Sequence, residues 1–120
     1  MELLVYKASA GSGKTFTLAV EYIKLLILNP RAYRQILAVT FTNKATAEMK
    51  ERILSQLYGI WTEDPDSDAY LKRIIEETGK QTDEIRKSAG IALSYMLHDY
   101  SRLRVETIDS FFQSVMRNLA

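Results

Sequence analysis

The sequence predicts an α/β fold in which about three parallel strands and about five helices form three layers. Two observations carry this prediction. Continuous apolar runs at residues 3–6 and 36–39 are typical of strands buried on both faces of a parallel sheet. An amphipathic segment of helical period follows each run, and a helical crossover is the connection that a right-handed βαβ unit requires. With 120 residues, the chain forms one domain at most.

The first half of the chain should contain two strand–helix units. Residues 2–7 form the first strand, and Phe16–Leu28 forms the first helix. That helix ends at Asn29-Pro30, because the residue before a proline avoids helical backbone. We expect the second strand at Gln35–Thr42 and the second helix at Ala45–Tyr58. The positions that repeat at helical spacing and should be buried are Ala19, Tyr22, Ile23, Leu26, Ile27, Met49, Ile53 and Leu57.

The second half should be mainly helical. The elements that we expect there are an exposed acidic loop at 62–68, helices at Ala69–Thr78 and Asp83–Tyr100, a strand at Leu103–Ile108 and a last helix running to Ala120. Gly79 ends the first of these helices, and Asp109 or Ser110 should cap the last one. The buried side of the Asp83–Tyr100 helix should carry Ala89, Ala92, Leu93, Met96 and Tyr100.

The charges and the missing cysteines narrow the class of protein. Residues 1–58 carry eight lysines and arginines against four acids, whereas residues 59–104 carry seven against nine, so the first half suits phosphates better. The chain has no cysteine and no aliphatic run that could span a bilayer, and from the acidic Glu2 and the early start of the first strand we expect no signal peptide. These features predict a cytoplasmic protein without a disulfide framework or membrane partner.

A phosphate-binding loop is the strongest motif. It follows the first strand and reads Ala8, Ser9, Ala10, Gly11, Ser12, Gly13, Lys14 and Thr15. Gly11 and Gly13 let backbone N–H groups turn into one concavity at the positive end of the next helix. Lys14 would reach the β and γ phosphates of ATP, and the Thr15 hydroxyl would hold the Mg²⁺ that bridges them. Ala8 replaces the first glycine of the usual pattern, which indicates a negative φ at the loop's entry.

A second polar segment follows the second strand. Thr40, Phe41, Thr42, Asn43 and Lys44 should lie at the carboxyl end of that strand, which is the edge where open α/β sheets bind ligands. An aromatic face can stack on any base, and small hydroxyl and amide groups reach backbone phosphates.

Three blocks of sequence resemble motifs I, Ia and Ic of the UvrD/Rep-like superfamily 1 helicases. The blocks are 8–15, 37–53 and 105–112, and the first and last are closest in form to the RecB and AddA helicase-nucleases. The resemblance implies that the first block binds ATP and Mg²⁺, with Lys14 and Thr15 catalytic. It implies contacts to single-stranded DNA from a set that comprises Thr40, Phe41, Thr42, Asn43, Thr107, Ser110 and Phe111. Asp109 departs from the family's usual histidine, and since a carboxylate repels phosphate, helix capping is its expected role.

Several residues also have a structural interpretation. Phe41 could be core instead of stacking on a base, and Phe16 could pack in the core or lie against adenine. The tyrosines from Tyr58 to Tyr100 are expected to pack, and His98 to be solvated. The acidic run at 63–68 lacks the glycine and glutamate of a calcium loop and is interpreted as a linker.

The resemblance therefore implies that residues 1–120 are the N-terminal part of the ATP-binding domain of a helicase that translocates on single-stranded DNA in repair or recombination. The expected partners are that DNA, the remainder of the helicase chain and a helicase-nuclease partner subunit. No apolar strand ends in the acidic pair that hydrolysis needs, so the chain alone should bind Mg-nucleotide weakly and be inactive. The alternatives are a small P-loop kinase with Asp109 on Mg²⁺, and a DNA-binding adaptor with a vestigial loop.

Overall fold

The computed structural model describes residues 2–5 and 13–119 of the chain, with side chains from Thr15 onward. Residues 8–12 of the predicted phosphate loop lie outside this part. The elements in order are β1 (Glu2–Val5), α1 (Gly13–Leu28), the 3₁₀ turn η1 (Ala32–Gln35), β2 (Ile36–Thr40), α2 (Asn43–Trp61), η2 (Pro65–Ser67), α3 (Asp68–Thr78), α4 (Thr82–His98), η3 (Tyr100–Arg102), β3 (Val105–Thr107) and α5 (Ile108–Leu119).

The three described strands form one parallel sheet in the order β1-β2-β3. Leu3 is in register with Leu37, and Ala38 with Val105. All five residues of the central strand β2 are buried, as its continuous apolar run predicts. The α/β class and the parallel sheet are therefore confirmed. The strands are shorter than predicted, since β2 ends at Thr40 and β3 covers only three residues.

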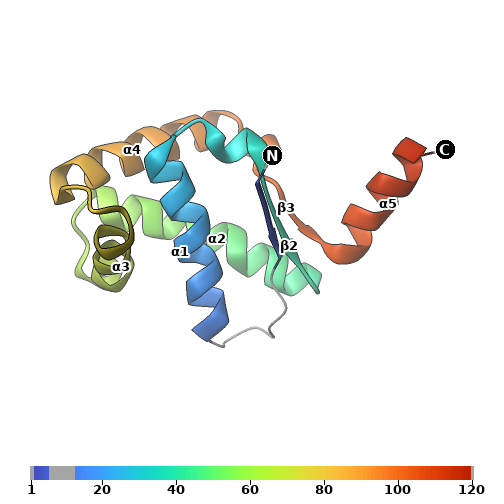
Figure 1. Cartoon of the computed structure of the whole chain (residues 1–120), viewed down its shortest axis with the longest axis horizontal. Coiled ribbons are helices and arrows are strands. Elements are labelled where there is room, and N and C mark those ends of the chain that lie inside the picture. The colour runs from blue at the N-terminus through green and yellow to red at the C-terminus, as the bar shows by residue number, and fades with distance from the viewer. Residues whose placement is uncertain (1, 6–12, 120) are drawn as a thin grey trace.

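Helices α1, α2, α3 and α4 gather on one side of the sheet (Figure 1) and enclose the main hydrophobic core. Every position predicted to be buried in the first two helices is at most 2% exposed. On α4 the prediction holds for its alanines, Leu93 and Met96 but is wrong for Tyr100, which is 47% exposed. The reason is that α4 ends at His98, so Tyr100 starts η3 and leaves the helical period.

The tyrosines expected to pack divide into two groups. Tyr70 is buried, but Tyr58, Tyr95 and Tyr100 are exposed to 55%, 36% and 47%. Helical spacing places these residues on a helix face without deciding whether another element covers that face. The packing prediction is therefore wrong for the three exposed rings.

The helices begin earlier than the sequence predicts. α1 begins at Gly13 rather than Phe16, and α2 begins at Asn43 and runs to Trp61. Thr42 explains the second case, because its Oγ1 accepts the N–H of Ala45 at 3.0 Å and so caps α2.

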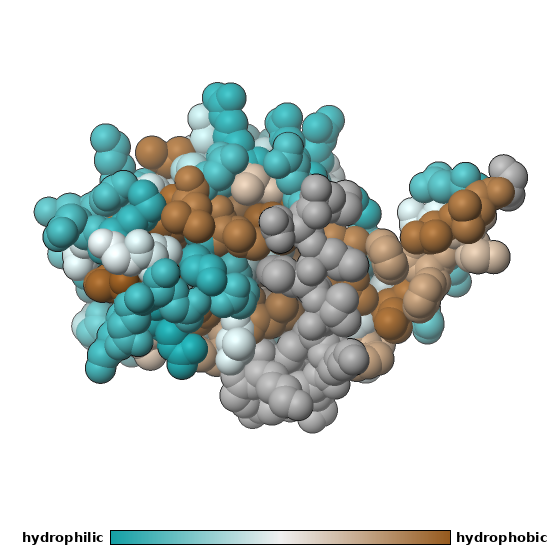
Figure 2. All heavy atoms as spheres, viewed as in Figure 1, coloured by the Kyte–Doolittle hydropathy of each residue, from teal (hydrophilic) through white to brown (hydrophobic). Residues whose placement is uncertain are grey.

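Helix α5 extends away from the rest of the molecule (Figure 1), and none of its residues is buried. Its apolar residues form an exposed stripe (Figure 2) in which Phe112, Met116 and Leu119 are 56%, 64% and 76% exposed. These three lie at spacings of four and three residues, the pattern of one helix face. The predicted third layer is therefore wrong for the described residues, because α5 leaves the end of β3 without lying flat on the sheet.

Candidate functional site

The site lies at the carboxyl edge of the sheet, where α2 follows β2 and α5 follows β3. Because all three strands are parallel, the N-terminus of α1 lies toward the same edge (Figure 1). Helix N-termini carry partial positive charge and unpaired N–H groups, so this edge is suited to anions.

The described part of the predicted phosphate loop is the first turn of α1. Gly13 and Lys14 open the helix, and Thr15 is 4% exposed. The start of α1 at Gly13 puts Gly13, Lys14 and Thr15 in the turn whose N–H groups have no helical partner. A threonine hydroxyl in that position supplies the hard oxygen that Mg²⁺ prefers, so the chemistry of this residue fits the metal.

A network of threonines shapes the segment after β2. The Oγ1 of Thr40 lies 2.6 Å from the Oγ1 of Thr46, on the first turns of α2, and donates to the backbone oxygen of Thr42 at 3.3 Å. The N–H of Thr46 donates to that same Thr42 oxygen at 3.0 Å. These bonds tie the end of β2 to the start of α2, which rigidifies the turn between them.

The network separates the predicted contact residues into two kinds. The side chain of Thr40 is 1% exposed and hydrogen-bonded inside the protein, so in this structure it positions the turn. Phe41, Thr42 and Asn43 are exposed. Phe41 is 51% exposed, which excludes its interpretation as a core residue and leaves its ring available for stacking.

The third predicted segment starts α5. The Oγ1 of Thr107 accepts the N–H of Ser110 at 3.2 Å, so Thr107 is the residue that caps this helix. The capping role predicted for Asp109 or Ser110 is wrong, because α5 begins at Ile108 and both residues lie within its first turn. Ser110 is exposed, and Phe111 is half-buried with its ring centroid 6.0 Å from that of Phe112.

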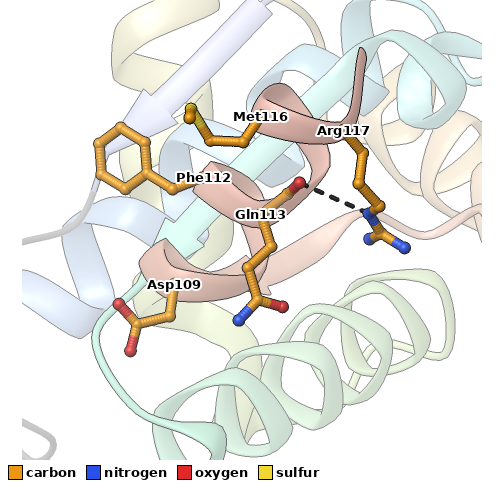
Figure 3. Close-up of a pocket in the computed structure, with 5 residues that line it drawn as sticks. All are labelled: Asp109, Phe112, Gln113, Met116 and Arg117. Atoms are coloured by element: carbon orange, nitrogen blue, oxygen red, sulfur yellow. Dashed lines mark hydrogen bonds between the residues drawn. The ribbon is translucent and has the colours of Figure 1, made fainter. Parts of the chain in front are cut away.

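An open groove of about 570 Å³ runs along α5 (Figure 3). Its lining residues are Asp109, Phe112, Gln113, Met116 and Arg117. Phe112 and Met116 lie side by side as its apolar part, and Arg117 donates to the backbone oxygen of Gln113 at 3.4 Å. Asp109 is the groove's carboxylate and is exposed, so nothing in its surroundings resembles a buried magnesium ligand.

The remaining candidates have structural roles in the described residues. Phe16 packs against the core, with its ring centroid 4.6 Å from that of Tyr70, as the core interpretation predicts. The exposed His98 bonds its Nδ1 to the backbone oxygen of Ser94 at 2.7 Å. Across the described ranges, no group of three acidic, histidine or cysteine side chains could hold a metal ion. None of the helices described is both long and apolar enough to cross a membrane.

Sequence reasoning missed one residue of the site, Thr46. Thr46 lies inside the block 37–53, where the sequence indicates only that it is a small residue on a helix. Its place four residues after Thr42 was a usable signal, since residues at this spacing share one face of a helix.

The comparisons with known proteins agree on one family. The family model described as UvrD/REP helicase N-terminal domain matches residues 2–120. RecBCD enzyme subunit RecB of Escherichia coli is 39% identical over 83 residues, covering 59% of this chain and 7% of that protein. ATP-dependent DNA helicase UvrD1 of Mycobacterium leprae is 52% identical over 50 residues, covering 42% of this chain and 6% of that protein.

A third relative is an ATP-dependent helicase/nuclease subunit of Clostridium perfringens, which is 40% identical over 73 residues, covering 59% of this chain and 6% of that protein. The chain therefore spans less than a tenth of the length of these relatives. No solved structure matches the chain significantly.

Proposed function

The chain belongs to the UvrD/REP helicase N-terminal domain family, and we propose that it is the ATP-binding, strand-contacting part of an ATP-dependent DNA helicase. The observation that carries this proposal is the convergence of three segments on one sheet edge. The first turn of α1, the exposed Phe41 and the start of α5 all lie toward that edge. A nucleotide and a strand of DNA could bind side by side at such an edge.

On the nucleotide side, Lys14 binds the β and γ phosphates of ATP and the hydroxyl of Thr15 holds Mg²⁺. Residues 8–13 supply backbone N–H groups to the phosphates. The position of Gly13 and Lys14 at the helix start, and the burial of Thr15 in the same turn, support these roles. When bound, the metal neutralises the phosphate charge; the chain's own part is to orient the phosphates and exclude water.

On the DNA side, Phe41 stacks on a base while Thr42 and Asn43 contact the backbone. Thr107, Ser110 and Phe111 continue this contact at the start of α5. Thr40 acts through the turn that it holds, because its hydroxyl is engaged with Thr46.

In the longer protein, this segment works with regions that its relatives carry beyond the matched part. We propose that ATP hydrolysis there drives translocation along single-stranded DNA in repair or recombination in the cytoplasm. The arginines and acidic pair that hydrolysis needs come from outside this chain, which alone binds nucleotide without efficient turnover. Two of the relatives are named as subunits, which supports a helicase-nuclease partner subunit.

The nucleotide half of the proposal is tested on the chain itself. Titration of a fluorescent ATP analogue with Mg²⁺ should give binding that Lys14→Ala weakens by roughly 10-fold or more, the loss of one charge-assisted hydrogen bond. Lys72→Ala is the matched control, because Lys72 is an exposed lysine of α3. Equal affinities for the chain and its Lys14→Ala variant would refute the assignment.

The DNA half is tested with Phe41→Ala. Loss of one stacking contact should weaken binding of a fluorescent oligothymidylate by roughly 5-fold to 100-fold and leave the ATP analogue unaffected. Equal loss of both ligands would mean that Phe41 supports the fold instead. In a longer chain that includes the other helicase regions, DNA-stimulated ATPase activity should vanish in Lys14→Ala. DNA-independent phosphate transfer to a small molecule would instead favour the kinase alternative.

A further inference from the structure

A second charged surface lies at the opposite, amino edge of the sheet. The turn η1 leads into β2 there, and η3 leads toward β3. We name this surface the amino-edge strip, whose residues are Arg31, Arg34, Lys50, Tyr95, Tyr100, Arg102 and Arg104. It is separated from the candidate site by the length of β2, roughly 13 Å at the usual rise of a strand. In Figure 2 this upper edge of the molecule carries projecting hydrophilic residues.

Two adjoining hollows make the strip continuous. One, of about 390 Å³, is lined by Arg34, Lys50 and residues 101–106. The other, of about 290 Å³, is lined by Arg31, Tyr33, Arg34 and Tyr95. Arg34 borders both, so an elongated ligand can follow one hollow into the other.

The strip has an excess of positive charge. Its five basic side chains face two carboxylates, Asp99 and Glu106, which leaves a net charge of +3. Arg31 and Lys50 have no carboxylate partner among the described residues. An anionic ligand would therefore provide the negative charge to pair with the positive charges of these two residues.

Asp99 holds the arginines in place. Its Oδ2 accepts hydrogen bonds from Tyr33 Oη at 2.8 Å and from Arg34 Nε at 3.1 Å. Its Oδ1 lies 3.6 Å from Arg102 Nε. The hydrogen bond from Tyr33 and the nearby guanidinium groups lower the pKa of Asp99 below its usual value. A guanidinium has five N–H donors, so Arg34 and Arg102 keep donors for a ligand.

Aromatic rings alternate with these charges. The guanidinium of Arg31 lies over the ring of Tyr95 at 5.1 Å from its centroid, and its Nη2 donates to Tyr95 Oη at 3.2 Å. The Nζ of Lys50 lies 5.8 Å from the ring centroid of Tyr100. Both rings are more than a third exposed, and both rings and guanidinium planes are surfaces on which unpaired bases stack.

We propose that the amino-edge strip is a second binding surface for single-stranded nucleic acid, with its basic side chains on phosphates and Tyr95 and Tyr100 against bases. Exposed rings between the charges distinguish this ligand from a duplex, whose bases are already stacked, and from an acidic peptide, which has no bases to stack. The surface does not depend on the nucleotide or DNA roles of the carboxyl edge.

The test measures anisotropy of a labelled oligothymidylate of about 16 nucleotides, the upper site size of one single-strand-binding fold, over a range of salt. The Arg31→Gln/Lys50→Gln chain removes the two cations that lack carboxylate partners. Losing two phosphate contacts should weaken binding roughly 25-fold at 0.1 M salt and reduce the salt slope by about 1.4. The control Lys72→Gln/Lys87→Gln removes equal charge from exposed positions on α3 and α4 and should change neither quantity.

All measurements are made in the Phe41→Ala chain, so that the carboxyl edge contributes little and its own assignment can fail separately. Tyr95→Leu is the second variant and should weaken binding by roughly 5-fold or more. Circular dichroism checks that each variant is folded. The proposal is overturned if the Arg31→Gln/Lys50→Gln chain behaves like its control. It is also overturned if a DNA duplex binds as tightly as the oligothymidylate when both affinities are expressed per phosphate. The same holds if polyglutamate displaces the oligothymidylate as well as an unlabelled oligothymidylate does at equal concentration of negative charge.

Discussion

The hydroxyl pair of Thr40 and Thr46 gives the sharpest test of how the carboxyl edge is built. Thr40→Val keeps the shape of a side chain that is 1% exposed and removes its 2.6 Å hydrogen bond. It leaves the hydroxyl of the half-buried Thr46 without this partner, and the loss of one hydrogen bond costs about 1 kcal/mol. For a domain of this size, such a loss lowers the melting temperature by roughly 4 °C.

The assay is thermal and urea unfolding followed by circular dichroism, together with oligothymidylate binding. The double variant Thr40→Val/Thr46→Val leaves no hydroxyl of this pair without its partner. It should therefore lose at least about 0.5 kcal/mol less free energy of unfolding than the two single variants lose when their losses are added. Thr82→Val is the control, since Thr82 at the start of α4 has no side-chain hydrogen bond in the described part of the chain, and its free energy of unfolding should stay within about 0.5 kcal/mol of that of the parent chain.

Binding should fall in Thr40→Val even though its side chain does not reach the surface, because Phe41 follows it directly. Additive single effects, or a melting temperature equal to that of Thr82→Val, would show that the hydroxyl pair does not hold the turn.

Two further predictions concern stability. Gly79→Ala should cost about 1 kcal/mol, because Gly79 ends α3 with φ of 69°, and Gly79→Asn should cost less; equal urea midpoints for the two variants would contradict this. Glu77 Oε1 lies 3.0 Å from Lys24 Nζ, and this contact lowers the pKa of Glu77 in the folded protein. The ion pair therefore stabilises the fold fully above the pKa of Glu77 in the unfolded chain, near 4.3. This stabilisation is lost as the pH falls through the lower pKa of the folded state. Glu77→Gln should therefore melt lower than the parent chain at pH 7, with a difference that disappears toward pH 3; a difference that is constant with pH would exclude the ion pair as its cause.

The sequence predicted those features that depend on local period and chain order. Buried faces of α1 and α2 follow from apolar residues at helical spacing, and the position of Thr40–Asn43 follows from a parallel sheet. The buried helix faces and the position of this segment depend on residues that are close together in the chain, so both could be predicted from the sequence.

Features formed between distant segments could not be read in this way. The exposure of Tyr95 depends on what covers α4, and no pattern within α4 encodes that. The alternation of apolar and polar residues predicts a strand that runs to Ile108, whereas β3 ends at Thr107, so Thr107 and not Asp109 caps α5. A shift of one or two residues at the start of a helix changes which side chain faces its free N–H groups. The strip joins residues from 31 to 104, which only the folded chain brings together.

Helix α2 connects the two edges of the sheet physically. Thr42, Thr46 and Lys50 are spaced four residues apart from its N-cap onward, so they follow one face of the helix, with about 6 Å between successive members. The first two shape the carboxyl edge and the third belongs to the amino-edge strip. A helix whose Ile53 and Leu57 are fully buried moves as one body with the core, so the separation of the two surfaces is fixed by α2 itself. Loss of the Thr42 cap would fray only the first turn, and would therefore loosen the carboxyl edge while leaving Lys50 in place.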